Sequence, residues 1–366
     1  FDVSCIVNEL SEMIGSRMRK AYQPHYEQVV LKLNRKGLPS TDLVIVRGKR
    51  LYTSQRDRPM PSKPSQFAMV IRKHLNNARL VDVNQYGFDR IVELVFEKTR
   101  EKIKIIIELF RDGNILLIDN EGIIIQPLTH AKYSTRSLKK GLEYRPPPES
   151  FNPRSMKRKE LESLLENSEH DLIRTLAVRA NFGSLYGSIA CSKSKIDENI
   201  VANKLLSEQI DSLEKTIKDM IKELDDKNNV KIWMKNTKSL EKWNSNDDIE
   251  EREDMVSQIQ DIAPINIPSL NSQLSTKIDS LSSGFDIIYG MHDAAAFIRR
   301  EEEKLIQSGK DDGEKKAKLV RRSEQQKIAI EKFLQRAAIN QELGKSIQEN
   351  WSHVNDILEQ FNQAIT

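Results

Sequence analysis

Short apolar, β-branched-rich runs recur between positions 28 and 126 of the chain, and turn residues separate most of them. Such runs predict β-strands, and Gly, Asn and Asp at the breaks predict tight turns. The predicted strands are 28–33, 42–46, 50–53, 80–85, 90–96, 103–110, 114–119 and 123–126. Strands joined by such short turns run antiparallel, so this part is predicted to form an antiparallel sheet.

Two helices are predicted in the same region. Ile6 and Leu10 belong to a helical repeat over residues 2–20, in which Asp2 is the expected N-cap. A second helix is predicted over residues 65–75. Helices beside an antiparallel sheet indicate an α+β fold for the first domain.

Changes in the hydrophobic pattern and in composition divide the chain into four segments. They are an α+β domain at 1–150, a helical segment at 151–227, a mixed segment of short strands at 228–290 and a helical arm at 291–366. The stiff run Pro146–Pro148 closes the first domain. In the arm, apolar residues from Ile330 to Ile365 follow the 3-4 spacing of a coiled coil, with interruptions at Asn340 and Gly344.

Residues 176–190 have the pattern of a helix-hairpin-helix. Gly183 and Gly187 would bracket a tight turn that opens the second helix. Such a turn can present bare backbone N–H groups and a helix N-terminus to a phosphate. A purely structural α-hairpin has the same pattern, so both interpretations stay open.

Charge is unevenly distributed along the chain. Residues 1–160 hold 30 Lys and Arg against 18 Asp and Glu, while the other 206 residues hold 28 against 36. A basic domain attracts polyanions such as nucleic acids, although a solvated lysine-rich surface has the same composition. Cys5 and Cys191 lack metal-ligand spacing and indicate a reducing compartment. No apolar run approaches the about 18 residues that a membrane span needs, and no export leader is visible, so neither membrane contact nor secretion is expected.

The pair Asp89–Arg90 follows a turn signal at Gly87 and opens a predicted strand. Adjacent strand residues point to opposite faces, so one faces outward and the other inward, unless the turn directs both into one groove. A surface ion pair is the simplest structural role. Arginine can also hold a phosphate bidentately or stack on a base, and aspartate can accept from base amino groups or a ribose 2′-OH.

Taken with Phe1–Leu10, Pro61–Leu75 and Phe110–Asp119, residues 82–94 resemble the NFACT family, also known as fibronectin-binding-protein-A-like proteins. The family includes ribosome quality-control factors and the nuclear export mediator factor, and the archaeal branch is the most similar. The resemblance implies a first domain like formamidopyrimidine-DNA glycosylases, then a helix-hairpin-helix domain, a segment that packs back on the first domain, and a long coiled-coil arm. It also implies that a returning helix and a C-terminal domain are missing, so we expect a fragment.

By the same resemblance, Asp2, Asp89 and Arg90 are expected to bind tRNA. The implied role is a cytoplasmic factor of ribosome-associated quality control. Such a factor binds the large ribosomal subunit (rRNA and ribosomal proteins) with its stalled peptidyl-tRNA. It recruits aminoacyl-tRNA, chiefly alanyl, for C-terminal tailing without mRNA. Self-association through the coiled coil is a further expectation.

Four more residues are candidates for RNA contact, each with a structural alternative. Arg72 and Lys73 end the second predicted helix, where a solvated helix end is the alternative. Arg111 and Asn114 belong to a turn that resembles a recurrent family turn, which could extend the same groove or be an ordinary β-turn.

No enzymatic activity, cofactor or metal site is expected. The six histidines are scattered, and no Gly-rich phosphate loop or convincing Ser/His/Asp set is visible. The related glycosylases use an N-terminal proline, whereas this sequence begins Phe1-Asp2. Two rival classes remain as alternatives: a DNA-repair glycosylase and a fibronectin-binding adhesin.

Overall fold

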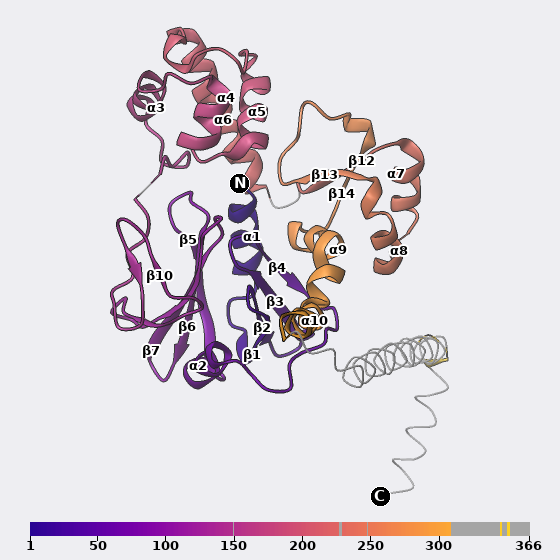
Figure 1. The fold of residues 1–366 in the computed structure, drawn as a ribbon. Helices are drawn as coiled ribbons and strands as arrows, with labels where there is room; N and C mark the ends of the chain where they lie inside the picture. The colour runs from indigo at the N-terminus through magenta and orange to yellow at the C-terminus, as the bar shows by residue number, and fades with distance from the viewer. Residues whose placement is uncertain (149, 227–228, 247, 309–344, 346–349, 352–366) are drawn as a thin grey trace, which may run out of the picture. The chain divides into compact units, whose positions relative to one another are not determined.

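The computed structural model describes residues 1–148, 150–226, 229–246, 248–308, 345, 350 and 351 (Figure 1). The chain divides into two units, Phe1–Glu302 and Glu303–Thr366, and every element described up to α9 lies in the first. Among the described helices, none has the length and apolarity that crossing a bilayer requires.

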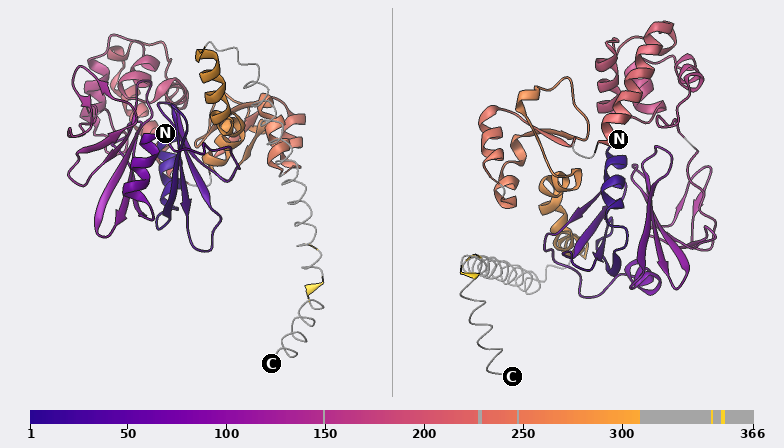
Figure 2. Two further views of the ribbon diagram at one scale, coloured as in Figure 1. Left: turned by 60° about the horizontal axis from the view of Figure 1, so that its bottom comes forward. Right: turned by 180° about the vertical axis from the view of Figure 1, so that it is seen from behind.

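A nine-stranded antiparallel sheet occupies most of the first 127 residues (Figures 1 and 2). Its strands are β1 (Arg17–His25), β2 (Gln28–Asn34), β3 (Thr41–Val46), β4 (Arg50–Ser54), β5 (Arg79–Gln85), β6 (Ile91–Lys98), β7 (Glu101–Glu108), β8 (Ile115–Ile118) and β9 (Ile124–Pro127). They lie in the order β4-β3-β2-β1-β5-β6-β7-β8-β9. β1 and β5 share a single register pair, Arg17 with Arg79, so the sheet consists of two halves that meet at one corner.

Two helices pack against this sheet. α1 (Asp2–Ser11) lies on β5 and buries Ile6 and Leu10 in the main core. α2 (Gln66–Leu75) packs on β1, and it begins where the Ser65 hydroxyl accepts a hydrogen bond from the Ala68 amide at 3.1 Å. The helix predicted over residues 65–75 is therefore confirmed, with Ser65 as its N-cap.

A helical segment follows the sheet and the small hairpin β10 (Ala131–Lys132) and β11 (Ser137–Leu138). Its elements are α3 (Arg158–Glu166), α4 (Leu172–Arg174), the π-helical η1 (Thr175–Arg179), α5 (Gly183–Ser194), the 3-10 helix η2 (Ala202–Lys204) and α6 (Ser207–Asp225). Leu213, Ile217 and Met220 recur at helical spacing along α6 and are fully buried. This stripe packs α6 against α5 and the rest of the segment.

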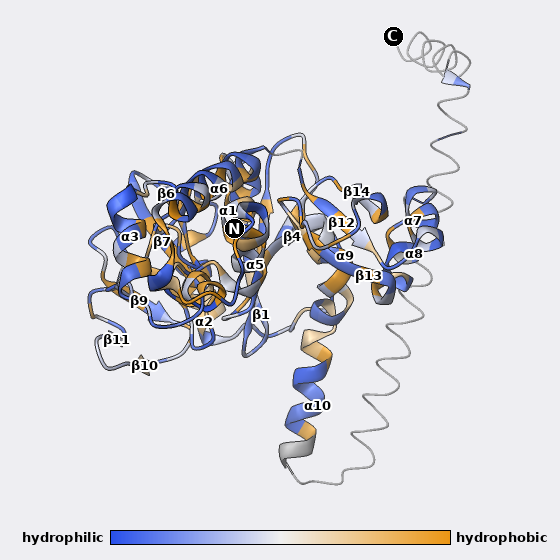
Figure 3. Cartoon of the chain, turned by 90° about the horizontal axis from the view of Figure 1, so that it is seen from above, coloured by the Kyte–Doolittle hydropathy of each residue, from blue (hydrophilic) through white to orange (hydrophobic). Residues whose placement is uncertain are grey.

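The chain continues into a third group of elements. They are β12 (Lys231–Met234), α7 (Thr237–Asn244), α8 (Ile249–Asp254), η3 (Val256–Gln258), β13 (Ile259–Ala263), η4 (Ser272–Leu274), β14 (Ser275–Lys277), α9 (Leu281–Ala294) and α10 (Ala296–Ser308). β12 is the central strand of the three-stranded sheet β13-β12-β14. Figure 3 shows the hydrophilic run of α10, which contains residues 299–304.

α9 packs on the first sheet, and polar contacts with α1 and β4 hold its two ends. At its start, the two carboxylate oxygens of Glu9 in α1 accept from the amides of Leu281 at 2.6 Å and Ser282 at 3.0 Å. Near its end, Asp293 accepts from the Arg50 Nε at 2.8 Å and from the Tyr52 hydroxyl at 2.9 Å. α9 therefore covers β4, the edge strand of the nine-stranded sheet.

The α+β fold with an antiparallel sheet is confirmed, and each predicted strand has a counterpart. The helix predicted over residues 2–20 is wrong beyond Ser11, because Gly15 adopts a φ of +96° and Arg17 already begins β1. The N-cap is Phe1 and not Asp2. Three helices, α7, α8 and most of α9, were missed in the segment predicted to hold short strands.

The predicted coiled coil and its self-association fall almost wholly on residues outside the described ranges. The domain boundaries and the helix-hairpin-helix assignment stay predictions. Within that assignment one detail is wrong: Gly187 lies inside α5 rather than at the turn. A Cβ at Gly187 would stand 3.3 Å from the Ile173 carbonyl oxygen, so a side chain here would push α5 and α4 apart by a few tenths of an ångström.

We predict that the contact of α9 with β4 weakens in acid. Burial alone would raise the pKa of Asp293, but the hydrogen bonds and charge of Arg50 outweigh it and hold that pKa below its usual value. A lowered pKa stabilises the folded state above the unfolded value of about 3.9, and this contribution is lost as the pH falls through the native pKa. Hydrogen-exchange protection of α9, corrected for intrinsic rates, should fall below about pH 4.

Asp293→Asn should show low protection of α9 already at pH 7, because removing one partner of a buried pair costs about 3 kcal/mol. The exposed Asp254 of α8 provides the control, since Asp254→Asn removes the same charge without touching α9's ion pair. Equal protection in the two variants would contradict the role of Asp293.

Candidate nucleic-acid interface

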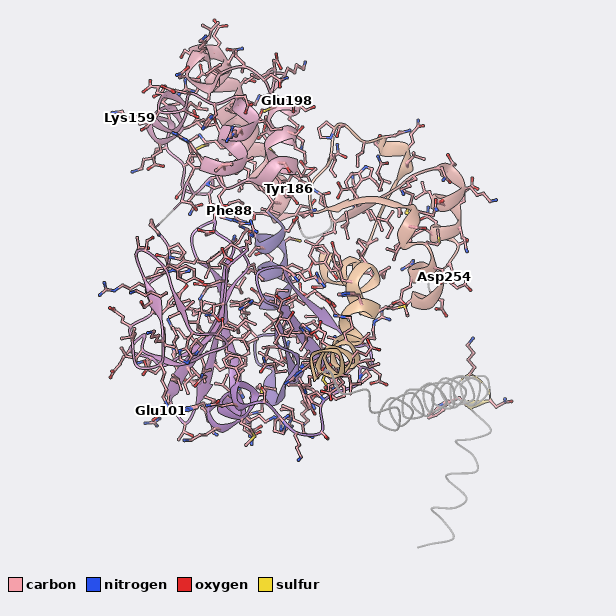
Figure 4. All side chains as sticks on the ribbon, viewed as in Figure 1. Phe88, Glu101, Lys159, Tyr186, Glu198 and Asp254 are labelled. Atoms are coloured by element: carbon pink, nitrogen blue, oxygen red, sulfur yellow. The ribbon has the colours of Figure 1, made fainter. Side chains whose placement is uncertain are left out.

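Four aromatic rings join the start of α1, the loop between β5 and β6, and α5. The Phe1 ring stacks on Tyr186, with centroids 4.3 Å apart and planes inclined by 16°. It also makes edge contacts with Phe88 at 5.1 Å and Phe182 at 5.2 Å. Figure 4 labels Phe88 and Tyr186 beside the start of α1. Three segments distant in the sequence are therefore packed around one ring, which we call the aromatic cluster.

Asp89 follows Phe88 and turns its carboxylate toward the helical segment. Its Oδ1 accepts from the Arg90 amide at 2.7 Å and from the Asn181 Nδ2 at 2.9 Å. Its Oδ2 accepts from the Ser150 hydroxyl at 3.5 Å. The half-buried carboxylate thus connects three segments: the loop between β5 and β6, the segment after Pro148 that contains Ser150, and the loop before α5.

Arg90 does not share these contacts. Its side chain is exposed and, within the described part of the chain, its guanidinium forms no ion pair or hydrogen bond. The surface ion pair with Asp89 is therefore not formed. Both residues lie in the turn before β6 and not in a strand, so the expected alternation of strand faces does not apply to them, and a shared groove stays a prediction. An unpaired guanidinium beside an anchored carboxylate is free to take an anion.

The loop between β7 and β8 lies at the same end of the sheet. The Leu109 amide donates to the Arg90 carbonyl at 2.7 Å, which ties this loop to the Asp89–Arg90 turn. Arg111 is exposed and has no side-chain partner among the described residues. Arg90 and Arg111 thus present two free guanidinium groups along one sheet end.

Asn114 has a different position from its predicted one. The residue is fully buried, its Nδ2 donates to the Thr129 carbonyl at 2.6 Å, and its Oδ1 accepts from the Ile115 amide at 2.9 Å. A side chain whose hydrogen bonds are satisfied internally cannot reach RNA, so Asn114 fixes the loop that carries Arg111. Gly113 has no room for a side chain, because a Cβ would overlap the Glu108 carbonyl.

Asp2 follows Phe1 of the aromatic cluster and accepts a hydrogen bond from the Tyr186 hydroxyl. Burial, and next the charge of Asp2, raise the pKa of Tyr186 well above its ordinary value. The hydroxyl therefore stays protonated and keeps donating at neutral pH. Asp2 is half-buried, so part of its carboxylate faces solvent.

Arg72 and Lys73 do not belong to the surface formed by Asp89, Arg90 and Arg111, which we call the Asp89–Arg90 surface. The Arg72 Nε donates to the Ala21 carbonyl at 2.8 Å and its guanidinium lies 4.9 Å from the Tyr22 ring centroid, so it packs α2 on β1. Lys73 is exposed at the end of α2. This end of α2 is followed closely in the sequence by Arg79 of β5, which lies opposite Glu97 of β6 in the sheet register. Glu97 is near the end of β6, whereas Arg90 precedes its start, so Lys73 and Arg90 lie toward opposite ends of that strand.

Gly183 begins α5 and is exposed, with a φ of +75° that favours glycine. Its position beside Asn181, which also has positive φ, fits a tight turn between η1 and α5. The phosphate contact predicted for this turn stays a prediction.

Sequence reasoning missed Ser150, Asn181 and Tyr186, which hold the two aspartates. The sequence contained one indication for Asn181, because asparagine tolerates the left-handed conformation that precedes a helix start. It contained none for Ser150 and Tyr186, since their hydrogen-bond partners lie 61 and 184 residues away in the sequence.

Metal binding and thiol chemistry have no support among the described residues. They contain no group of three His, Cys, Asp or Glu side chains arranged to hold a metal ion. Both cysteines are buried: burial raises the pKa of Cys191 to about 12, and that of Cys5 further still. Thiols of this kind are poor nucleophiles at neutral pH.

Comparison with known proteins gives a consistent assignment. The family model described as NFACT N-terminal and middle domains matches residues 1–366. The archaeal Rqc2 homolog aRqcH of Methanocaldococcus jannaschii is 28% identical over 375 residues, covering 99% of this chain and 51% of that protein. The ribosome quality control complex subunit NEMF of Homo sapiens is 34% identical over 128 residues, covering 35% of this chain and 12% of that protein.

A solved structure has a similar fold. The N-terminal part of the fibronectin/fibrinogen-binding protein from Streptococcus suis superposes with a TM-score of 0.58 and 21% identity, covering 79% of this chain and 98% of that chain. The present chain spans about half the length of its archaeal relative, so the activity of a whole protein goes beyond what these matches show.

We predict different consequences for the two residues of the Asp89–Arg90 pair. Asp89→Ala should lower the melting temperature and increase proteolysis between residues 150 and 182. It removes hydrogen bonds to a charged group worth about 1.5–3 kcal/mol each. Arg90→Ala should leave both unchanged, because its side chain has no described partner. Asn181→Ala should resemble Asp89→Ala; identical melting temperatures for Asp89→Ala and Arg90→Ala would contradict the anchoring role.

Proposed function

Because the chain belongs to the NFACT family, we propose that it acts as a non-enzymatic, cytoplasmic factor of ribosome quality control that binds tRNA on the large ribosomal subunit. Its part would be to select and place aminoacyl-tRNA, chiefly alanyl, beside a stalled peptidyl-tRNA. Bond formation would belong to the ribosome, which would extend the nascent chain at its C-terminus without mRNA.

The observation that supports this proposal most directly is the free guanidinium of Arg90 beside the anchored carboxylate of Asp89. Arg90 would contact a phosphate or stack on an unpaired base. Asp89 would hold the turn in place and offer its less engaged Oδ2 to a ribose hydroxyl or base amino group. Arg111 would add a second cation, and the solvent-facing part of Asp2 a second acceptor.

We predict that Arg90→Ala weakens tRNA binding about ten- to a hundredfold without a change in melting temperature. The expected loss corresponds to one charge-assisted contact of about 1.5–3 kcal/mol. Filter binding with a tRNA transcript at fixed salt measures it. Arg35→Ala is the matched control, because Arg35 is also exposed and donates only to the Glu12 carbonyl among its described contacts.

The double variant Arg90→Ala/Arg111→Ala should lose more affinity than Arg90→Ala, since both groups lie at one sheet end. Unchanged tRNA binding in the double variant would refute this surface as the tRNA site. Binding of duplex DNA with release of a base would favour the glycosylase alternative. Binding of fibronectin with no RNA affinity would favour an adhesin.

We also predict that tRNA binding and subunit binding separate along the chain. Deleting residues 303–366 removes the second unit and leaves the Asp89–Arg90 surface complete. The shortened protein should retain tRNA affinity but lose co-sedimentation with large ribosomal subunits, while its circular dichroism per residue shows a folded first unit. Full recovery with the subunits would show that the arm is not the main anchor.

A further inference from the structure

The hairpin of β6 and β7 ends in a turn whose backbone is strained. Lys98 and Glu101 face each other in register, so the turn consists of Thr99 and Arg100. Both have positive φ, 51° and 71°, in the region that disfavours side chains. Turns of this kind usually contain Asn-Gly, and strained positions that persist often mark functional sites.

Cations gather around this turn from several elements. Arg79 of β5 faces Arg17 of β1 on one side and Glu97 of β6 on the other. Glu97 in turn faces Lys102 of β7. The set that we call the basic tip consists of Arg17, Lys73, Arg79, Lys98, Arg100, Lys102 and Lys140.

His74 at the end of α2 reports how close these groups lie. Burial is the largest cause of its lowered pKa; the charges of Lys73 and Lys98 lower the pKa further, Glu101 raises it, and Lys140 has a weaker lowering effect. Cations of three separate elements, α2, β6 and the turn after β11, therefore all act on this one imidazole.

The charge of the basic tip is not neutralised within the described part of the chain. None of its seven members forms an ion pair there, and six are exposed while Arg17 is half-buried. Two carboxylates, Glu97 and Glu101, are interspersed with them. Like charges opposite each other on neighbouring strands, such as Arg17 and Arg79, destabilise a sheet. Glu97 lies opposite Arg79 and Lys102, and Glu101 lies opposite Lys98, so these carboxylates offset part of the charge. Backbone strain and an excess of positive charge thus coincide at one place.

The basic tip is separate from the Asp89–Arg90 surface. Arg90 precedes the first residue of β6, and Lys98 is its last, so they are separated by the length of that strand. At about 3.3 Å per residue this length is roughly 25 Å. Figure 4 labels Phe88 and Glu101 toward opposite ends of the hairpin.

We propose that the basic tip binds the sugar-phosphate backbone of RNA, of tRNA or of ribosomal RNA, as a second contact independent of Asp89 and Arg90. Residues 97–102 contain cations, carboxylates and Thr99 but no aromatic or large apolar side chain. Phosphate contacts of this kind position a nucleic acid without reading its bases. Surfaces that bind membranes combine cations with apolar groups that insert, and the turn offers none.

The test compares two triple variants of the 366-residue chain that lose the same charge. Lys98→Gln/Arg100→Gln/Lys102→Gln changes the basic tip, and Lys204→Gln/Lys215→Gln/Lys238→Gln changes exposed lysines elsewhere. Binding of a tRNA transcript, a ribosomal RNA stem and phosphatidylserine vesicles is measured over a range of salt. We expect the tip variant to bind one or both RNAs at least tenfold more weakly, with a salt slope smaller by about two, because fewer counterions are released.

The RNA that loses affinity identifies the ligand, and either result supports the proposal. Equal losses in the two triple variants would overturn it, as would an effect confined to vesicles. A chain that binds the ribosomal stem through the tip but does not bind tRNA would disprove the proposed function while leaving this inference intact.

A second variant separates binding from stability. Thr99→Asn/Arg100→Gly introduces the residues that the turn geometry favours, so the melting temperature should rise. RNA affinity should fall, because Arg100 is lost, and the salt slope should shrink by about one. A rise in melting temperature with unchanged affinity for both RNAs would show that the strained turn has no part in binding.

Discussion

The packing of Phe1 among Phe88, Phe182 and Tyr186 determines how the first half of the molecule is assembled. Burying an aromatic side chain of this size contributes about 1.5–3 kcal/mol, and each well-oriented aromatic pair adds about 0.5–1.5 kcal/mol. The ring belongs to the start of α1, and its partners belong to the sheet and to the helical segment. Asp2 and Asp89 directly follow Phe1 and Phe88 in the sequence, so this packing also positions the two carboxylates.

The returning segment contacts the first sheet through apolar packing, in which Phe285 of α9 lies against Val44, Val46 and Tyr52, and through several ion pairs. Arg50 pairs with Asp293, and Arg56 pairs with Asp286 and Glu253. Buried ion pairs contribute little net stability, since desolvation offsets much of their attraction, but they penalise any other arrangement in which a charge stays unpaired. The ion pairs therefore specify where α9 docks on β4 more than they strengthen the fold. The apolar core formed by α1, α2 and the strands provides the stability.

The sheet could be predicted because its information is local. Most strands from Gln28 onward are short apolar runs that end near a turn residue, so their positions could be predicted, whereas the pairing of β1 with β5 could not, because it is no hairpin connection. The helix over residues 2–20 was predicted too long because β1 depends on its pairing with β2, which the local pattern does not show. In the site, the sequence singled out Asp89 and Arg90 but placed Arg90 in a strand, whereas both residues lie in the turn before β6. The engagement of Asp89 by Asn181 could not be predicted, because no local pattern encodes a partner 92 residues away.

The bond between Glu9 and the start of α9 spans 272 residues of sequence, and this has a consequence for synthesis. A chain made from its N-terminus at about 5–20 residues per second completes β4 roughly 10 to 50 s before α9 emerges. During that interval the edge strand β4 and its arginines have no cover, and Glu9 has no helix to cap. Uncovered strand edges invite pairing with other chains. The charges of Arg50 in β4 and of Arg56 just beyond it then act first as protection against aggregation, and only afterwards as partners of the returning segment.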